Sequence, residues 1–142
     1  MTSIKNLGTI NVLQKKCIRI INFAPFNSHT NDLFITNKLI KLEDIVKTEK
    51  LKVAFDFINK NLPDELMNLF LYNSDVHFHS TRNVCNKGLF IPTINTTAYG
   101  NKSLRFSASM LWNAHIKKCE IKNIKTVGQF KTHLKKHFFS LY

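Results

Sequence analysis

The segment LEDIVKTEKLKVAFDFIN, residues 42–59, decides the fold of this 142-residue chain. Its acidic residues Glu43 and Asp44 fall in the first turn of a predicted helix, where carboxylates favour the positive end of the helix dipole. The apolar residues recur at helical spacing and form a stripe wide enough for a central helix with neighbours on two sides. We therefore expect a mainly α-helical fold built around this segment. The stripe comprises Leu42, Ile45, Val46, Leu51, Val53, Phe55, Phe57, Ile58 and Leu62.

A basic amphipathic helix is predicted before the central one, capped by Thr9 and ending before Pro25. Lys15, Lys16, Arg19 and Asn22 occupy one side of it. We expect its apolar stripe to pack into the core, with Cys17 buried as a small hydrophobic side chain. That stripe consists of Ile10, Leu13, Cys17, Ile20 and Ile21.

Four further helices are predicted from shorter patterns. One turn covers residues 31–36, and another helix covers 64–72 after Pro63. A third begins at Ser107 or Ser109. The last helix opens with a capping box of Thr126 and Gln129, and its apolar stripe contains Val127, Phe130, Leu134 and Phe138.

Two short strands complete the predicted fold. Residues 73–86 have the polar composition of a loop, whereas residues 88–91 and 103–106 are predicted to be two short strands joined by a polar turn. Tyr99 lies beside Gly100 in the connecting turn. The expected fold is mainly α, a single small domain of five to six helices with one two-stranded β-hairpin and a flexible start at residues 1–8.

The composition indicates a globular protein that works inside the cell. Hydrophobic residues make up 44% of the chain and Phe contributes 12, which is too apolar for disorder. The longest apolar runs are far shorter than the about 20 residues that span a bilayer, and no signal-peptide pattern is present. Three cysteines without a CxxC pair fit a reducing compartment. We expect cytoplasm or nucleus and no membrane partner.

The charge is unevenly distributed along the sequence. The net charge of +12 divides into +5 for residues 1–41, −3 for residues 42–75 and +10 for residues 76–142. Strongly basic segments are typical of proteins that bind a polyanion, of which nucleic acid is the commonest.

No residue pattern predicts an active site. His77, His79 and Cys85 match no common zinc spacing, although such a loop can bind a metal. Asp75 and His77 could form an acid–base pair with Cys85 as nucleophile, but no orienting residue or oxyanion site accompanies them. The four glycines are isolated, so no phosphate loop is present. We expect no cofactor, no metal and no catalytic residue, and keep a hydrolase only as a contrasting hypothesis.

The chain resembles the region that follows the polymerase core in jockey-like non-LTR retrotransposon reverse transcriptases. The similarity extends from about residue 12 to 138 in matching order and spacing. It departs at Ser107–Met110, where the family has a Gly-Pro-like turn, and after Asn113, where it has a small residue and Leu-Pro. The matching motifs are Leu13-Gln-Lys-Lys-Cys-Ile-Arg-Ile-Ile21, His29-Thr30 with Leu33-Phe34, Leu42-Glu43-Asp44, Asn61-Leu62-Pro63, Asn73-Ser-Asp-Val-His77 with Thr81-Arg82, Lys102-Ser-Leu-Arg-Phe106 and Leu111-Trp112-Asn113.

The resemblance implies a non-catalytic C-terminal part of an RNA-directed DNA polymerase. The family's polymerase holds two metals with an Asp-Asp pair, and this chain has no such pair, no palm and no endonuclease. By resemblance, the partners would be template RNA or an RNA–DNA duplex, and the polymerase core of the parent protein.

Two functions follow as alternatives. In the first, basic side chains bind nucleic acid electrostatically, and Arg82 and Arg105 are either phosphate ligands or structural forks. In the second, the chain docks on the polymerase core, which would leave an exposed apolar patch on the first helix, or it is a decayed remnant without activity. The predicted nucleic-acid contacts are Lys15, Lys16, Arg19, Arg82, Lys102, Arg105, Lys131, Lys135 and Lys136.

Overall fold

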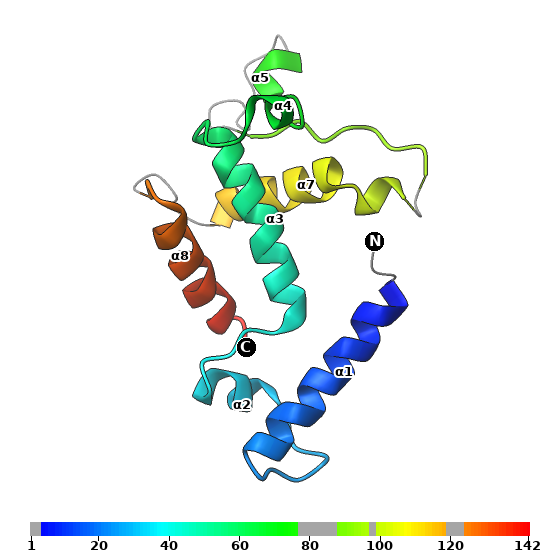
Figure 1. Ribbon diagram of the computed structural model, residues 1–142, viewed down its shortest axis with the longest axis vertical. Helices are drawn as coiled ribbons and strands as arrows, with labels where there is room; N and C mark the ends of the chain where they lie inside the picture. The colour runs from blue at the N-terminus through cyan, green and yellow to red at the C-terminus, as the bar shows by residue number, and fades with distance from the viewer. Residues whose placement is uncertain (1–3, 77–87, 97–98, 119–123) are drawn as a thin grey trace. The chain divides into compact units, whose positions relative to one another are not determined.

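A computed structural model describes residues 4–76, 88–96, 99–118 and 124–142 of the chain (Figure 1). The chain divides into two compact units. Unit 1 consists of residues 1–48 and 131–142, and unit 2 of residues 49–130. Each unit is described by itself below.

Unit 1 contains α1 (Ile4–Ile21), α2 (Asn31–Thr36), the start of α3 (Leu42–Ile58) and most of α8 (Val127–Phe139). Its buried apolar side chains are few: Ile18, Phe34, Leu134 and Phe138. The helix α1 begins at Ile4, so Thr9, expected to cap it, lies inside the helix. The helical path therefore includes most of the segment predicted to be a flexible start.

Three helices end in the same way, each with a non-glycine residue in the left-handed region. Phe23, Lys38 and Lys60 have φ of 50°, 53° and 57° after α1, α2 and α3. After α1, the N–H of Phe23 donates to the carbonyl of Ile20 and that of Ala24 to Arg19, which is the Schellman pattern. The same pair of bonds follows α2 and α3. These bonds end the three helices although none of them has a glycine at the left-handed position.

Unit 2 is built on aromatic packing around the second part of α3. The rings of Phe55 and Phe130 stack at 4.4 Å between centroids, and Trp112 lies 6.0 Å from Phe130. Phe57 contacts Phe70 and Tyr72. Of the stripe predicted for the central helix, Leu51, Phe55 and Phe57 are buried in this part, whereas Val53 and Ile58 are half-buried.

The predicted β-hairpin is wrong. No strand forms in the described residues: residues 104–106 are the first turn of α7 (Leu104–Lys118), Ser103 precedes it, and a 3₁₀ helix, η1 (Gly100–Lys102), lies before Ser103. Ser103 has extended backbone angles and its Oγ accepts a hydrogen bond from the N–H of Phe106. Ser103 therefore caps α7 in place of Ser107 or Ser109. This cap favours a helix more strongly than the alternating polar and apolar residues at 103–106 favour a strand.

The segment 88–90 is extended but pairs with no hairpin partner. It forms one antiparallel bridge with Tyr72, in which the N–H of Phe90 donates to Leu71 and that of Asn73 to Gly88. The expected helix 64–72 is shorter than predicted, since α4 covers Asp64–Met67, and the expected loop contains one turn of helix, α5 (Asn73–Val76).

The final helix matches the prediction more closely. The Oγ1 of Thr126 accepts a hydrogen bond from the N–H of Gln129, as a capping box requires. The Gln129 side chain accepts from Lys125, one residue earlier than in the standard box. Within the described part of the chain, no helix has the length and apolar content needed to cross a bilayer.

Candidate nucleic-acid interface

The helix α8 carries the clearest cationic surface of the predicted set. Its apolar stripe is buried, since Phe130 and Leu134 are inaccessible to solvent and Phe138 is nearly so. That burial turns Lys131, Lys135 and Lys136 to the solvent. Lys131 and Lys135 are one turn apart, about 6 Å along the axis. The helix contains no acidic residue, so no carboxylate of its own neutralises these charges.

A second cationic surface lies on α1. Lys15 and Lys16 are exposed and form no ion pair with a carboxylate of the described residues. Arg19 is half-buried, and its Nε donates to the carbonyl oxygen of Ser28 at 3.0 Å. Its guanidinium lies 5.9 Å from the ring centroid of Phe26. Arg19 therefore holds the turn after α1, which leaves the two lysines as the available cations.

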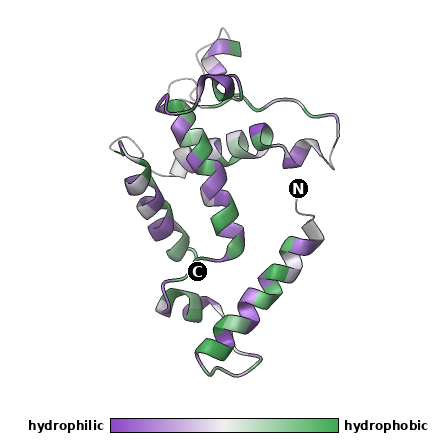
Figure 2. Ribbon diagram, viewed as in Figure 1, coloured by the Kyte–Doolittle hydropathy of each residue, from purple (hydrophilic) through white to green (hydrophobic). Residues whose placement is uncertain are grey.

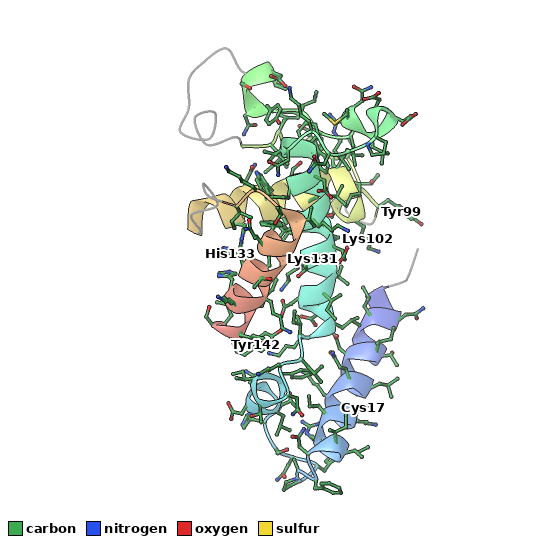
Figure 3. The ribbon with its side chains drawn as sticks, turned by 60° about the vertical axis from the view of Figure 1, so that its left-hand side comes forward. Cys17, Tyr99, Lys102, Lys131, His133 and Tyr142 are labelled. Atoms are coloured by element: carbon green, nitrogen blue, oxygen red, sulfur yellow. The ribbon has the colours of Figure 1, made fainter. Side chains whose placement is uncertain are left out.

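The remaining predicted cations belong to unit 2. Lys102 is exposed at the end of η1, near Tyr99, which is 76% exposed (Figure 3). Arg105 is half-buried in α7, and its Nε is buried without a hydrogen-bond partner among the described residues. Arg82 lies outside the described residues, so its predicted role stays a prediction.

The eight described contacts of the predicted set divide between the two units. Six of the eight described ones belong to unit 1 and two to unit 2. Within unit 1, α1 and the end of α8 lie on opposite sides of the first turn of α3 (Figures 1 and 3). Unit 1 has ten Lys and Arg against three Asp and Glu, so the C-terminal lysines join a unit that is already basic.

The apolar stripe of α1 is exposed, contrary to the prediction that it packs into the core. Ile20 is 73% exposed, Ile21 61%, Leu13 52% and Ile10 43%. Cys17, predicted to be buried, is an exposed free thiol. Figure 2 shows apolar and polar residues along the length of this helix. The exposed patch expected of a docking module is therefore present on the first helix.

Polar side chains hold α1 in place. The Nε2 of Gln14 donates to the carbonyl of Ile40 at 3.1 Å, and its Oε1 accepts from the N–H of Leu42 at 2.9 Å. Asn11 donates to the carboxylate of Glu43, and Ile18 is the only buried apolar side chain of the described part of the helix. The Gln of the LQKK motif thus has a structural role, which sequence reasoning missed.

The side-chain amide of Asn113 bonds backbone groups in unit 2, as that of Gln14 does in unit 1. Its Nδ2 donates to the carbonyl of Leu89 at 2.7 Å, and its Oδ1 accepts from the N–H of Leu89 at 2.8 Å. Both residues are buried. The amide therefore satisfies both backbone groups of one extended residue, and the Leu-Trp-Asn motif combines this clamp with the core residue Trp112.

Tyr142 anchors the end of α8 to the start of α3. Its hydroxyl donates to Oδ2 of Asp44 at 2.8 Å and accepts from the N–H of Lys41 at 2.9 Å. The Nζ of Lys41 lies 3.9 Å from the ring centroid, and Lys47 pairs with Asp44 at 2.8 Å. Burial, and then the neighbouring Asp44 carboxylate, raise the pKa of Tyr142 well above its usual range. Asp44, interpreted from the sequence only as a helix-dipole residue, is the buried acceptor of this network.

The described residues assemble no metal site, because no three His, Cys, Asp or Glu side chains come together among them. Asp75 accepts hydrogen bonds from the N–H of Tyr72 and the hydroxyl of Ser74, as a turn residue does. His77, His79 and Cys85, on which the metal and hydrolase alternatives depend, lie outside the described residues.

Comparisons with protein-family models, with curated proteins and with solved structures give no match to this chain. The resemblance to retrotransposon reverse transcriptases therefore rests on the quoted sequence motifs alone, and membership of that family stays a prediction.

Proposed function

We propose that the chain is a non-catalytic accessory module of a jockey-like non-LTR reverse transcriptase that binds RNA or an RNA–DNA duplex. The observation that carries this proposal is the outward face of α8, where Lys131, Lys135 and Lys136 are exposed on a helix without acidic residues. Lysines on a rigid helix neutralise phosphates and release counterions, which gives affinity without sequence preference.

A charge-neutralising triple variant tests this assignment. We expect Lys131→Gln, Lys135→Gln and Lys136→Gln together to weaken binding of single-stranded RNA by at least about tenfold at low salt. The slope of log affinity against log salt concentration should fall by about 2, since each lost contact to a single strand removes about 0.7. Fluorescence anisotropy at several salt concentrations measures both quantities.

A matched control separates the face of α8 from the net charge. Lys38, Lys50 and Lys60 lie outside the predicted set, and replacing all three by Gln changes the net charge equally. The control should keep most of the affinity and slope. Equal losses in the two triple variants would show that overall charge, not α8, is responsible, and no binding by the unmodified chain at low salt would refute the proposal.

Docking on a protein is the second candidate function, favoured by the exposed apolar stripe of α1. Contiguous apolar surface of this kind is typical of an interface. The polymerase core of the parent protein is the partner that the resemblance implies.

A further inference from the structure

The exposed stripe of α1 has the spacing of a helix–helix seam. Ile10, Leu13, Cys17 and Ile20 follow one another at intervals of three, four and three residues, which are the a and d positions of a seven-residue repeat. All four are exposed. They extend about 15 Å along the helix axis, or nearly three turns.

The seam is separate from the contacts that hold α1 in unit 1. Gln14 and Ile18, which attach the helix, lie on the neighbouring side at e and b positions of the same repeat. A partner that covers the a and d residues and the g flank, where Lys16 lies, therefore does not need to displace them. The a/d stripe, with Ile21 beside it at an e position, is narrower than the apolar face of a helix that lies on a membrane, which favours a helix as the partner.

The charge along the seam selects the kind of helix. Residues 4–21 include no Asp or Glu, and Lys16 lies at the g position beside the seam. Pairs between g and e positions determine which coiled-coil partners associate. A second copy of α1 would supply no carboxylate for Lys16, whereas an acidic helix would.

We propose that the α1 seam docks an amphipathic α-helix of a partner protein, with apolar a and d residues and glutamates on its flanks. This inference rests on the second candidate function and specifies its partner. It is independent of the lysines of α8, so RNA binding can fail while docking succeeds, and the reverse.

The test uses two labelled synthetic helical peptides and the full chain. Both peptides have leucine at a and d, and they carry either glutamate or lysine at e and g. We expect fluorescence anisotropy to show binding of the acidic peptide at least about tenfold tighter than of the basic one. The variant Lys16→Glu should reverse this preference. If the peptides bound only through apolar contact, the substitution would not change which peptide binds more tightly.

Two variants locate the binding surface. Leu13→Ser with Ile20→Ser should weaken acidic-peptide binding by at least about tenfold while leaving the denaturation midpoint unchanged, because both side chains are exposed. Ile45→Ser removes an exposed isoleucine from α3 of the same unit and should bind as the unmodified chain does. Bound acidic peptide should also slow alkylation of Cys17, followed by peptide mass mapping so that Cys85 and Cys119 are resolved separately.

Other outcomes overturn the proposal. Equal binding of the two peptides, or binding of neither, contradicts the charge assignment or the seam. Stripe-dependent binding to phosphatidylserine–phosphatidylcholine vesicles without peptide binding identifies a membrane surface as the occupant. A dimer in sedimentation that Ile20→Ser dissociates identifies a second copy.

Discussion

The helices α1 and α8 share a pattern of apolar and basic residues but have opposite environments. Both are amphipathic, basic and free of acidic residues. The stripe of α8 is buried at Phe130, Leu134 and Phe138, whereas that of α1 is open to solvent. The difference teaches that an apolar pattern identifies the side of a helix that needs a partner, but not whether the same chain provides it.

The two helices are also attached by different forces. Apolar burial and aromatic stacking hold α8, and the Tyr142 network supports its end. Backbone bonds to Gln14 and a single buried isoleucine hold α1. Mutations should therefore act on α8 through cavities and on α1 through lost hydrogen bonds.

The largest expected effect is that of Phe130→Ala. Phe130 is fully buried and stacks on Phe55, so its truncation leaves a cavity and should reduce the free energy of unfolding by about 3–5 kcal/mol. Ile20→Ala on α1 should change it by less than about 0.5 kcal/mol. Urea denaturation measures both. Similar costs at the two sites would mean that the α1 stripe is buried in solution.

A smaller effect is expected for Gln14→Ala. The substitution removes two hydrogen bonds to the backbone of Ile40 and Leu42 and should cost about 1–2 kcal/mol. The loss should be local, because Gln14, Ile40 and Leu42 all belong to unit 1. Limited proteolysis should then cut α1 first, while Asn6→Ala, at an exposed amide of the same helix, should leave the digestion pattern unchanged.

The smallest effect belongs to Tyr142→Phe, which should cost about 0.5–1.5 kcal/mol at neutral pH. Because folding raises the pKa of Tyr142, the unfolded chain loses its phenolic proton first. The stability contributed by this residue is complete below pH of about 10 and is lost as the pH rises above it.

Denaturation measured between neutral pH and the alkaline range checks this dependence. The difference between the unmodified chain and Tyr142→Phe should narrow above pH of about 10. Tyr72, whose pKa is also raised by burial and by Asp75, is present in both proteins and does not contribute to the difference. The control variant Tyr99→Phe, at an exposed tyrosine, should have the same stability as the unmodified chain at every pH. If the stability difference between the unmodified chain and Tyr142→Phe does not change with pH, the titration of Tyr142 is not its source.

Long periodic segments with local caps were predictable from the sequence. The final helix has both a stripe and the Thr126 cap, and the central helix has an unusually wide stripe. The hairpin was wrong because residues 103–106 alternate as a strand does, although Ser103 can begin a helix.

The exposure of α1 and the amide clamps were not predictable in the same way. Gln14 bonds backbone groups 26 and 28 residues away, and Asn113 bonds Leu89 from 24 residues away. Any residue offers the same backbone groups, so nothing in the sequence marks the acceptor or donor. The lysines of α1 and α8 were identified as exposed cations, but their separation on opposite sides of the first turn of α3 depends on the tertiary packing of unit 1.

The clamp at Asn113 makes the hydrogen bonding of Leu89 depend on α7. In a sheet, the N–H of Leu89 would be satisfied by a neighbouring strand as the two strands meet. Here it is satisfied by the Asn113 side chain of α7. Opening of α7 should therefore free the amide of Leu89, and hydrogen exchange at that amide reports how often this opening occurs.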